Sequence, residues 1–87
     1  MSFVDDLADA LARDVLAAQD EVGDDRFYEK VARVLGASSP TIQEAFLTCV
    51  RIRLAEMRGR AFFEQTLSAA RAGGAAPDAP RDYGGGH

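Results

Sequence analysis

Residues 31–42 of the chain, VARVLGASSPTI, decide its fold. Apolar residues recur at helical spacing up to Gly36, and glycine readily takes the left-handed conformation that ends many helices. Ser39 and Pro40 then form a strong helix start, in which a hydroxyl N-cap precedes proline at the first helical position. The stretch predicts a helix that ends at Leu35, a three-residue turn after Gly36, and a second helix from Pro40.

Upstream of this stretch, the pattern predicts a first helix over residues 3–21. Ser2 is placed to cap it, with Asp5 three residues later as in a variant of the capping box. Apolar residues follow at spacings of three and four, which is typical of a helix with one buried face: they are Val4, Leu7, Leu11, Val15, Ala18 and Val22. Gly23 ends this helix, and Asp24 or Asp25 is expected to cap the next one.

Downstream, the helix from Pro40 meets Gly59 before its next clear stop at Gly73 and Gly74. An unbroken helix over residues 40–72 would be about 50 Å long at ~1.5 Å per residue, longer than a small domain is wide. We therefore expect a bend or break near residues 58–60. The alternative is a continuous helix that projects and packs on a second copy.

The chain is predicted to be all-α, with three to four helices and a long third helix. One helical domain is expected over residues 1–72, and a disordered tail over residues 73–87, where five glycines and two prolines accompany few apolar groups. A folded part this small is marginally stable alone. With one cysteine in the chain, no internal disulfide can stabilise it, so self-association is expected.

Charge is distributed unevenly along this acidic chain, whose net charge is −4. Residues 1–25 hold eight acidic residues and one basic residue, whereas residues 26–60 hold seven basic and three acidic ones. Either the basic segment binds an anionic partner, or the two segments attract each other within the fold.

Within the basic segment, a small residue, a glycine four positions later and a branched apolar residue six beyond that occur at Ala32, Gly36 and Ile42. Apolar residues flank them: Val31, Leu35, Ala37 and Ala45. With this spacing, residues 27–50 resemble the helix-turn-helix motif of DNA-binding proteins. The resemblance implies that the start of the second helix enters the major groove.

The DNA-binding residues that this resemblance implies are Ser38, Ser39, Thr41, Gln43, Glu44, Lys30, Arg33 and Arg51. Gln43 can pair with adenine and Glu44 can accept from cytosine. Arg26 adds a further positive charge. The alternatives are structural. In these, Ser39 and Thr41 are helix caps, and Gln43 and Glu44 belong to a solvated face.

The third helix is apolar over more than half of its circumference, which indicates burial on more than one side. Either residues 61–70 fold back to cover the rest, or a second subunit does. The residues expected in an oligomer interface are Phe46, Val50, Leu54, Met57, Phe62 and Phe63. Four clustered arginines of the same helix either hold phosphates or an acidic partner surface, or pair with Glu56, Glu64 or the acidic face of the first helix: they are Arg51, Arg53, Arg58 and Arg60.

Catalysis and metal binding have little support in the sequence, so we expect a non-enzyme without cofactor or metal. The only histidine, His87, lies in the tail, and Cys49 sits in an apolar run where a thiol is usually inert. No apolar run reaches the roughly 20 residues that span a bilayer. We expect a cytoplasmic protein that does not enter a membrane.

Two functional hypotheses follow. The first is a small oligomeric protein that interacts with DNA, as a transcriptional regulator or as a subunit similar in overall plan to the small terminase subunits of phages. The second is an adaptor that keeps the same helical shape but binds a protein partner. The net acidic charge favours the adaptor, whereas the charge distribution and the turn motif favour DNA.

Overall fold

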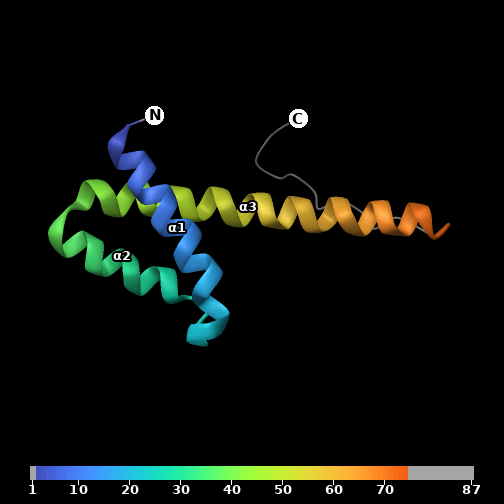
Figure 1. Cartoon of the computed structure of the whole chain (residues 1–87), viewed down its shortest axis with the longest axis horizontal. Helices are drawn as coiled ribbons and strands as arrows, with labels where there is room; N and C mark the ends of the chain where they lie inside the picture. The colour runs from blue at the N-terminus through green and yellow to red at the C-terminus, as the bar shows by residue number, and fades with distance from the viewer. Residues whose placement is uncertain (1, 75–87) are drawn as a thin grey trace, which may run out of the picture. The chain divides into compact units, whose positions relative to one another are not determined.

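The computed structural model describes residues 2–74, and these residues form an all-helical structure without strands. Three helices follow one another: α1 (Phe3–Val22), α2 (Phe27–Ser38) and α3 (Pro40–Arg71). Figure 1 shows α1 lying across α2 and the first part of α3. The prediction of an all-α fold is confirmed.

The chain divides into two units, residues 1–55 and residues 56–87. The first unit contains α1, α2 and the first half of α3, and the second contains the rest of α3. The tail predicted for residues 73–87 lies outside the described residues from position 75 onward.

The ends of α1 agree closely with the sequence prediction. Ser2 is the N-cap, and its hydroxyl oxygen accepts a hydrogen bond from the Asp5 backbone N–H at 3.1 Å. Gly23 follows the last helical residue in the left-handed conformation, with φ of 80°. Its N–H donates to the carbonyl oxygens of Gln19 and Asp20, which satisfies groups that the helix end leaves unpaired.

The start of α2 differs from the prediction, because neither Asp24 nor Asp25 caps it. The N-cap is Arg26, and no side chain provides the capping hydrogen bond. The Asp24 carboxylate instead accepts from the Arg26 backbone N–H at 3.0 Å and from Lys30 Nζ at 2.8 Å. It stabilises the link over residues 23–26 and ties that link to the first turn of α2.

The end of α2 also corrects the prediction, because Gly36 does not stop the helix. The helix continues to Ser38, and the glycines with positive φ among the described residues are Gly23 and Gly73. Gly36 leaves room for another side chain instead, since an added Cβ would lie 2.5 Å from Gln43 Nε2. The glycine therefore allows a close contact between α2 and α3.

A single residue, Ser39, joins α2 to α3, where three were expected in the turn. Its backbone is extended, with φ of −156° and ψ of 109°, and its N–H donates to the Leu35 carbonyl oxygen. Its hydroxyl accepts from the Ile42 N–H at 3.4 Å. The predicted start of α3 at Pro40 is confirmed, and Ser39 has the capping role that was its structural alternative.

The expected break near residues 58–60 is wrong, since α3 is continuous from Pro40 to Arg71. One glycine costs a helix only about 1 kcal/mol relative to alanine. The residues around Gly59 are good helix formers, and Arg60 donates across it to Glu56, with Nη2 2.6 Å from Oε2. The predicted stop at Gly73 is observed, where φ is 76°.

The core lies in the first unit and is small. Of the residues that the structure describes, six are buried, with contributions from all three helices: Ala8, Ala12, Val15, Ala32, Phe46 and Val50. Three of the six are alanines, so few large side chains are fully removed from water. Burying a large apolar side chain contributes about 1.5–3 kcal/mol, and a core this small leaves the unit marginally stable.

Candidate functional site

A groove between α2 and α3 brings together residues that the sequence analysis singled out for binding. Its volume is about 360 Å³, and it lies within the first unit. We call it the α2–α3 groove; its lining residues are Tyr28, Glu29, Ala32, Arg33, Gln43, Leu47, Val50, Arg51 and Leu54.

Helical spacing explains why these residues share one groove. Residues three and four apart lie on the same helix face, as Tyr28 and Ala32 do on α2 and Gln43 and Leu47 do on α3. Ala32 is buried, with 4% of its surface exposed, and its small side chain lets the two helices approach. The apolar floor therefore lies between polar groups from both helices.

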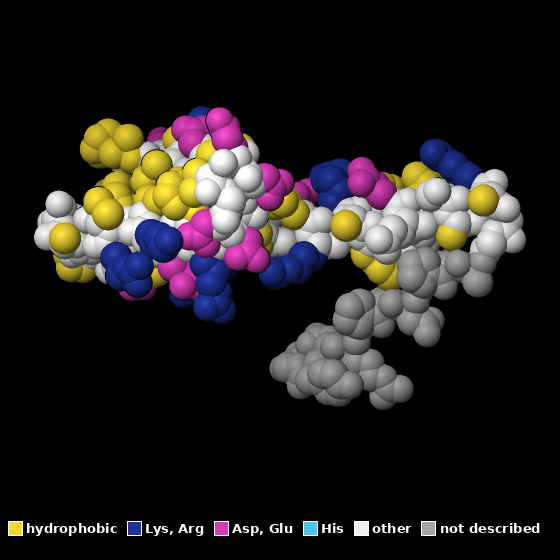
Figure 2. Space-filling view, turned by 90° about the horizontal axis from the view of Figure 1, so that it is seen from below, with side chains coloured by type: hydrophobic (Ala, Val, Ile, Leu, Met, Phe, Trp, Pro, Cys, Tyr) yellow, Lys and Arg dark blue, Asp and Glu magenta, His cyan; other side chains and the backbone are white. Residues whose placement is uncertain are grey.

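Arg33 and Arg51 give the groove its positive charge. Both are exposed, and neither makes an ion pair within residues 2–74. The carboxylate that lines the groove is that of Glu29, whose Oε2 lies 3.8 Å from Arg26 Nε. In the first unit, the view from below in Figure 2 shows basic side chains (dark blue) beside hydrophobic ones (yellow). The groove thus offers two cations without carboxylate partners.

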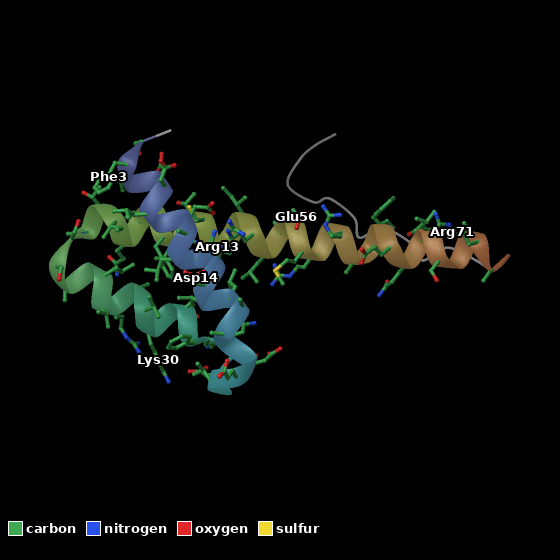
Figure 3. All side chains as sticks on the ribbon, viewed as in Figure 1. Phe3, Arg13, Asp14, Lys30, Glu56 and Arg71 are labelled. Carbon is green, nitrogen blue, oxygen red and sulfur yellow. The ribbon has the colours of Figure 1, made fainter. Side chains whose placement is uncertain are left out.

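The other residues predicted to bind DNA are placed differently. Ser38, Thr41 and Glu44 are exposed around the start of α3. Gln43 is half-buried and lies against Gly36 inside the groove, so it does not project from the surface as the resemblance implied. Lys30 projects from α2 in Figure 3, but its Nζ is bound to Asp24.

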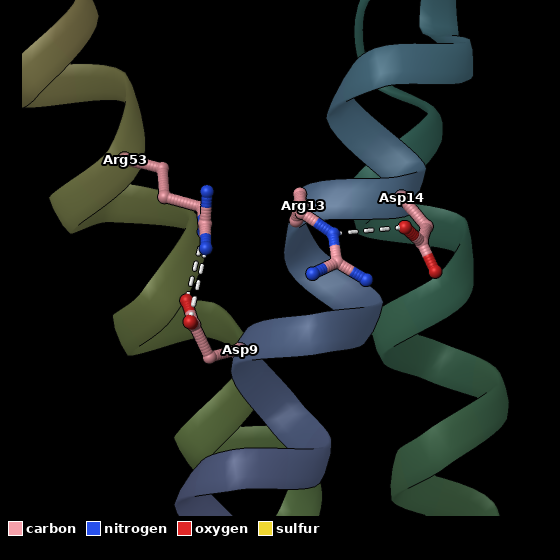
Figure 4. A network of polar contacts seen from close by, with 4 residues as sticks. All are labelled: Asp9, Arg13, Asp14 and Arg53. Carbon is pink, nitrogen blue, oxygen red and sulfur yellow. Dashed lines mark hydrogen bonds and ion pairs between the residues drawn. The ribbon is translucent and has the colours of Figure 1, made fainter.

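Of the four arginines that cluster over residues 51–60 of α3, two make ion pairs, as the structural alternative predicted. Arg53 Nε and Nη2 donate to the two carboxylate oxygens of Asp9 on α1, at 2.8 and 2.9 Å (Figure 4). These hydrogen bonds, with the arginine's positive charge, hold the pKa of Asp9 below its ordinary value. Arg60 pairs with Glu56. For Arg51 and Arg58, no ion pair is formed in the described part of the chain.

The predicted oligomer interface requires correction at two residues. Phe46 and Val50 are completely buried in the core, so they have no surface for a second subunit. Met57 and Phe63 remain more than half exposed, at 53% and 56%. The other two are half-buried, Leu54 in the α2–α3 groove and Phe62 in the second unit.

Sequence reasoning missed a second concavity, between α1 and α3, with a volume of about 470 Å³. We call it the α1–α3 cleft; it is lined by Asp5, Asp9, Ala45, Thr48, Cys49 and Ile52. Burial, followed by the charges of Asp9 and Asp5, raises the pKa of the Cys49 thiol, which keeps it protonated. The spacing of four residues between the two acids was the available signal, because it places both carboxylates on one face of α1.

Comparison with known proteins gives no match. No protein-family model, no curated protein and no solved structure is similar to this chain.

Among the described residues, no helix is both long and apolar enough to cross a membrane. Over the same residues, no group of three or more histidine, cysteine or acidic side chains could hold a metal ion.

Proposed function

We propose that the protein interacts with DNA as an oligomer and that the α2–α3 groove carries the contact. The observation that supports this is the position of Arg33 and Arg51 on two helices that flank one groove, both exposed and without a carboxylate partner within residues 2–74. Arginine binds phosphate well because its planar guanidinium offers several N–H donors. The two cations would contact the DNA backbone.

In this proposal, the exposed start of α3 lies nearest the bases. Thr41 and Glu44 are exposed there, and Ser38 is exposed just before it. These side chains can donate to phosphate oxygens or accept from cytosine. Gln43 would reach a base only after leaving its place against Gly36. The unit would then act as a helix-turn-helix with a turn shortened to Ser39.

The proposal requires several subunits, because one subunit has few cations available. Residues 1–55 contain ten acidic and six basic residues. Four of those basic residues are held by carboxylates in ion pairs: Arg13, Arg26, Lys30 and Arg53. Two phosphate contacts per subunit give weak binding, and an oligomer would multiply them. A transcriptional regulator and a subunit like the phage small terminases both fit this requirement.

The test is the salt dependence of DNA binding. Each lost phosphate contact should reduce the slope of log K against log [salt] by about 1, so replacing both Arg33 and Arg51 with alanine should reduce it by about 2 per bound subunit. A matched control replaces Arg13 and Arg71 with alanine, since both are exposed and lie outside the groove. DNA binding that is absent, or equal in the two double variants, would contradict the proposal.

The second candidate is a protein–protein adaptor, and exposed apolar side chains favour it. Phe3 on α1 and Val34 on α2 are 75% and 72% exposed, so both offer apolar surface to a partner. Figure 3 shows Phe3 projecting near the start of α1. An adaptor would bind its partner through apolar contacts that strengthen with salt, whereas DNA binding would weaken.

A further inference from the structure

The α1–α3 cleft has an apolar floor and an acidic rim. Ala45, Cys49 and Ile52 line it from α3, and Asp5 and Asp9 line it from α1. Ile52 is 63% exposed, although it is a large apolar residue. The Asp5 carboxylate makes no ion pair in the described structure, whereas Asp9 is bound to Arg53. An occupant would therefore present apolar groups to the floor and a cation to Asp5.

The second unit carries a helix face with those properties. Phe62 and Phe63 follow Gly59 by three and four residues, so the three lie on one face of α3. Arg58 and Arg60 are each one residue from the glycine, which places one on either side of that face. We call this the Gly59 face.

Two observations show that the Gly59 face is open to another molecule. Phe63 is 56% exposed. A Cβ added at Gly59 would meet no atom within 4 Å, so the backbone is bare on this side. A helix without a side chain at this point can approach another surface closely. Of the two flanking arginines, Arg60 is held by Glu56, whereas Arg58 makes no ion pair within the described residues.

We propose that the α1–α3 cleft of one copy binds the Gly59 face of a second copy, with Phe63 against Ile52 and Arg58 opposite Asp5. Charge complementarity selects this occupant, because Asp5 on the rim of the cleft and Arg58 beside the face both lack an ion-pair partner within residues 2–74. The contact adds apolar burial to a protein whose own core has few large side chains. Its two surfaces differ, so successive copies can add head to tail until a ring closes or a filament grows.

This inference develops the oligomeric part of the proposed function, and its test uses no DNA, so either can fail without the other. One variant, Ile52→Glu, blocks the cleft and leaves the Gly59 face intact. The other, Phe63→Glu, blocks the face and leaves the cleft intact. Both positions are more than half exposed, so both variants should fold, which circular dichroism would verify.

Analytical ultracentrifugation of the full-length chain gives the result. The wild type should be larger than a monomer, each variant alone should be monomeric, and an equimolar mixture should form a complex of one copy of each. In the mixture, the intact cleft of the Phe63→Glu variant can bind the intact Gly59 face of the Ile52→Glu variant. A contact between two identical faces would not be restored in this way. A monomeric wild type, a variant that assembles normally, or a mixture that stays monomeric would overturn the proposal.

A charge exchange tests the polar part of the contact. Asp5→Lys and Arg58→Glu should each weaken assembly at least tenfold, and the two together in one chain should restore most of it. Asp25→Lys with Arg71→Glu is the control exchange, since both positions are exposed and lie outside the two surfaces. Failure of the first exchange to restore assembly would contradict the pairing of Asp5 with Arg58.

Discussion

Arg53 of α3 donates two parallel hydrogen bonds to the carboxylate of Asp9 on α1, and the pair joins residues 44 positions apart in the sequence. The side chains are only partly exposed, at 34% and 43%. Paired donors fix orientation more strictly than a single contact does. This pair therefore sets how α1 crosses α3 beside the α1–α3 cleft.

Replacing Asp9 with asparagine should lower the melting temperature at neutral pH, because the charge-assisted pair with Arg53 is lost. The pKa of Asp9 lies below its ordinary value of 3.8, so the pair stabilises the fold fully above that pH. Its contribution disappears as the pH falls through the lowered pKa. The melting difference between variant and wild type should therefore shrink in acid.

Thermal unfolding followed by circular dichroism across an acidic pH series would measure this difference. Asp25→Asn serves as the control, since Asp25 is exposed and makes no hydrogen bond or ion pair in the described residues. A difference for Asp9→Asn that stays constant down to strongly acidic pH would contradict the assigned role.

Gly23, which follows the end of α1, and Gly59, which lies inside α3, should respond in opposite directions to alanine. Gly23 has a φ of 80°, where a side chain costs about 1–2 kcal/mol, so Gly23→Ala should destabilise the protein. Gly59 lies inside a helix with open space around it, so Gly59→Ala should stabilise the helix by about 0.5–1 kcal/mol. Denaturant unfolding of dilute samples would measure both changes in the free energy of unfolding. Two changes of the same sign would refute the assignment.

Gly36→Ala distinguishes the observed helix from the predicted turn. A left-handed glycine would make this change destabilising, whereas the helical Gly36 gains about 1 kcal/mol of helix propensity from alanine. The new Cβ would displace the flexible Gln43 amide, which offsets part of that gain. Gly36→Ala combined with Gln43→Ala should therefore be more stable than Gly36→Ala alone. Urea midpoints compare the three proteins, and a large loss for the single variant would support the turn instead.

Two phenylalanines from the predicted interface should differ strongly when replaced by alanine. Phe46 is fully buried, so its truncation should cost about 3–5 kcal/mol and could unfold the first unit. Phe63 is more than half exposed, so the same change should alter the monomer's stability by less than about 0.5 kcal/mol. Unfolding at low concentration, where assembly is absent, would make the comparison. Equal effects would contradict the placement of Phe46 in the core.

Local signals in the sequence predicted most helix ends correctly. Ser2, Gly23, Ser39 and Pro40 act through neighbouring backbone groups, and the structure places each at the helix end where it was expected. Such signals depend only on residues a few positions apart, so reading them does not require the tertiary structure.

Glycines inside helices were the source of the main errors. Gly36 and Gly59 carry the same local signal as Gly23, but packing and helix continuity outweigh a propensity term of about 1 kcal/mol. The role of Gly36 depends on Gln43, seven residues away on another helix. The α1–α3 cleft was missed for a related reason, because only the crossing of α1 and α3 brings Asp5 beside Cys49.

The one-residue joint at Ser39 links the two walls of the α2–α3 groove through a single pair of backbone torsions. One residue inserted in α2 between Arg33 and Ser39 would turn Arg33 and Tyr28 by about 100° about the helix axis relative to the joint, so both would leave the groove together. Substitutions can change the chemistry of this groove one side chain at a time, but a change in length between Arg33 and the joint would remove it in one step. We therefore expect homologues to vary in the residues that line the groove while the spacing between Arg33 and Gln43 stays constant.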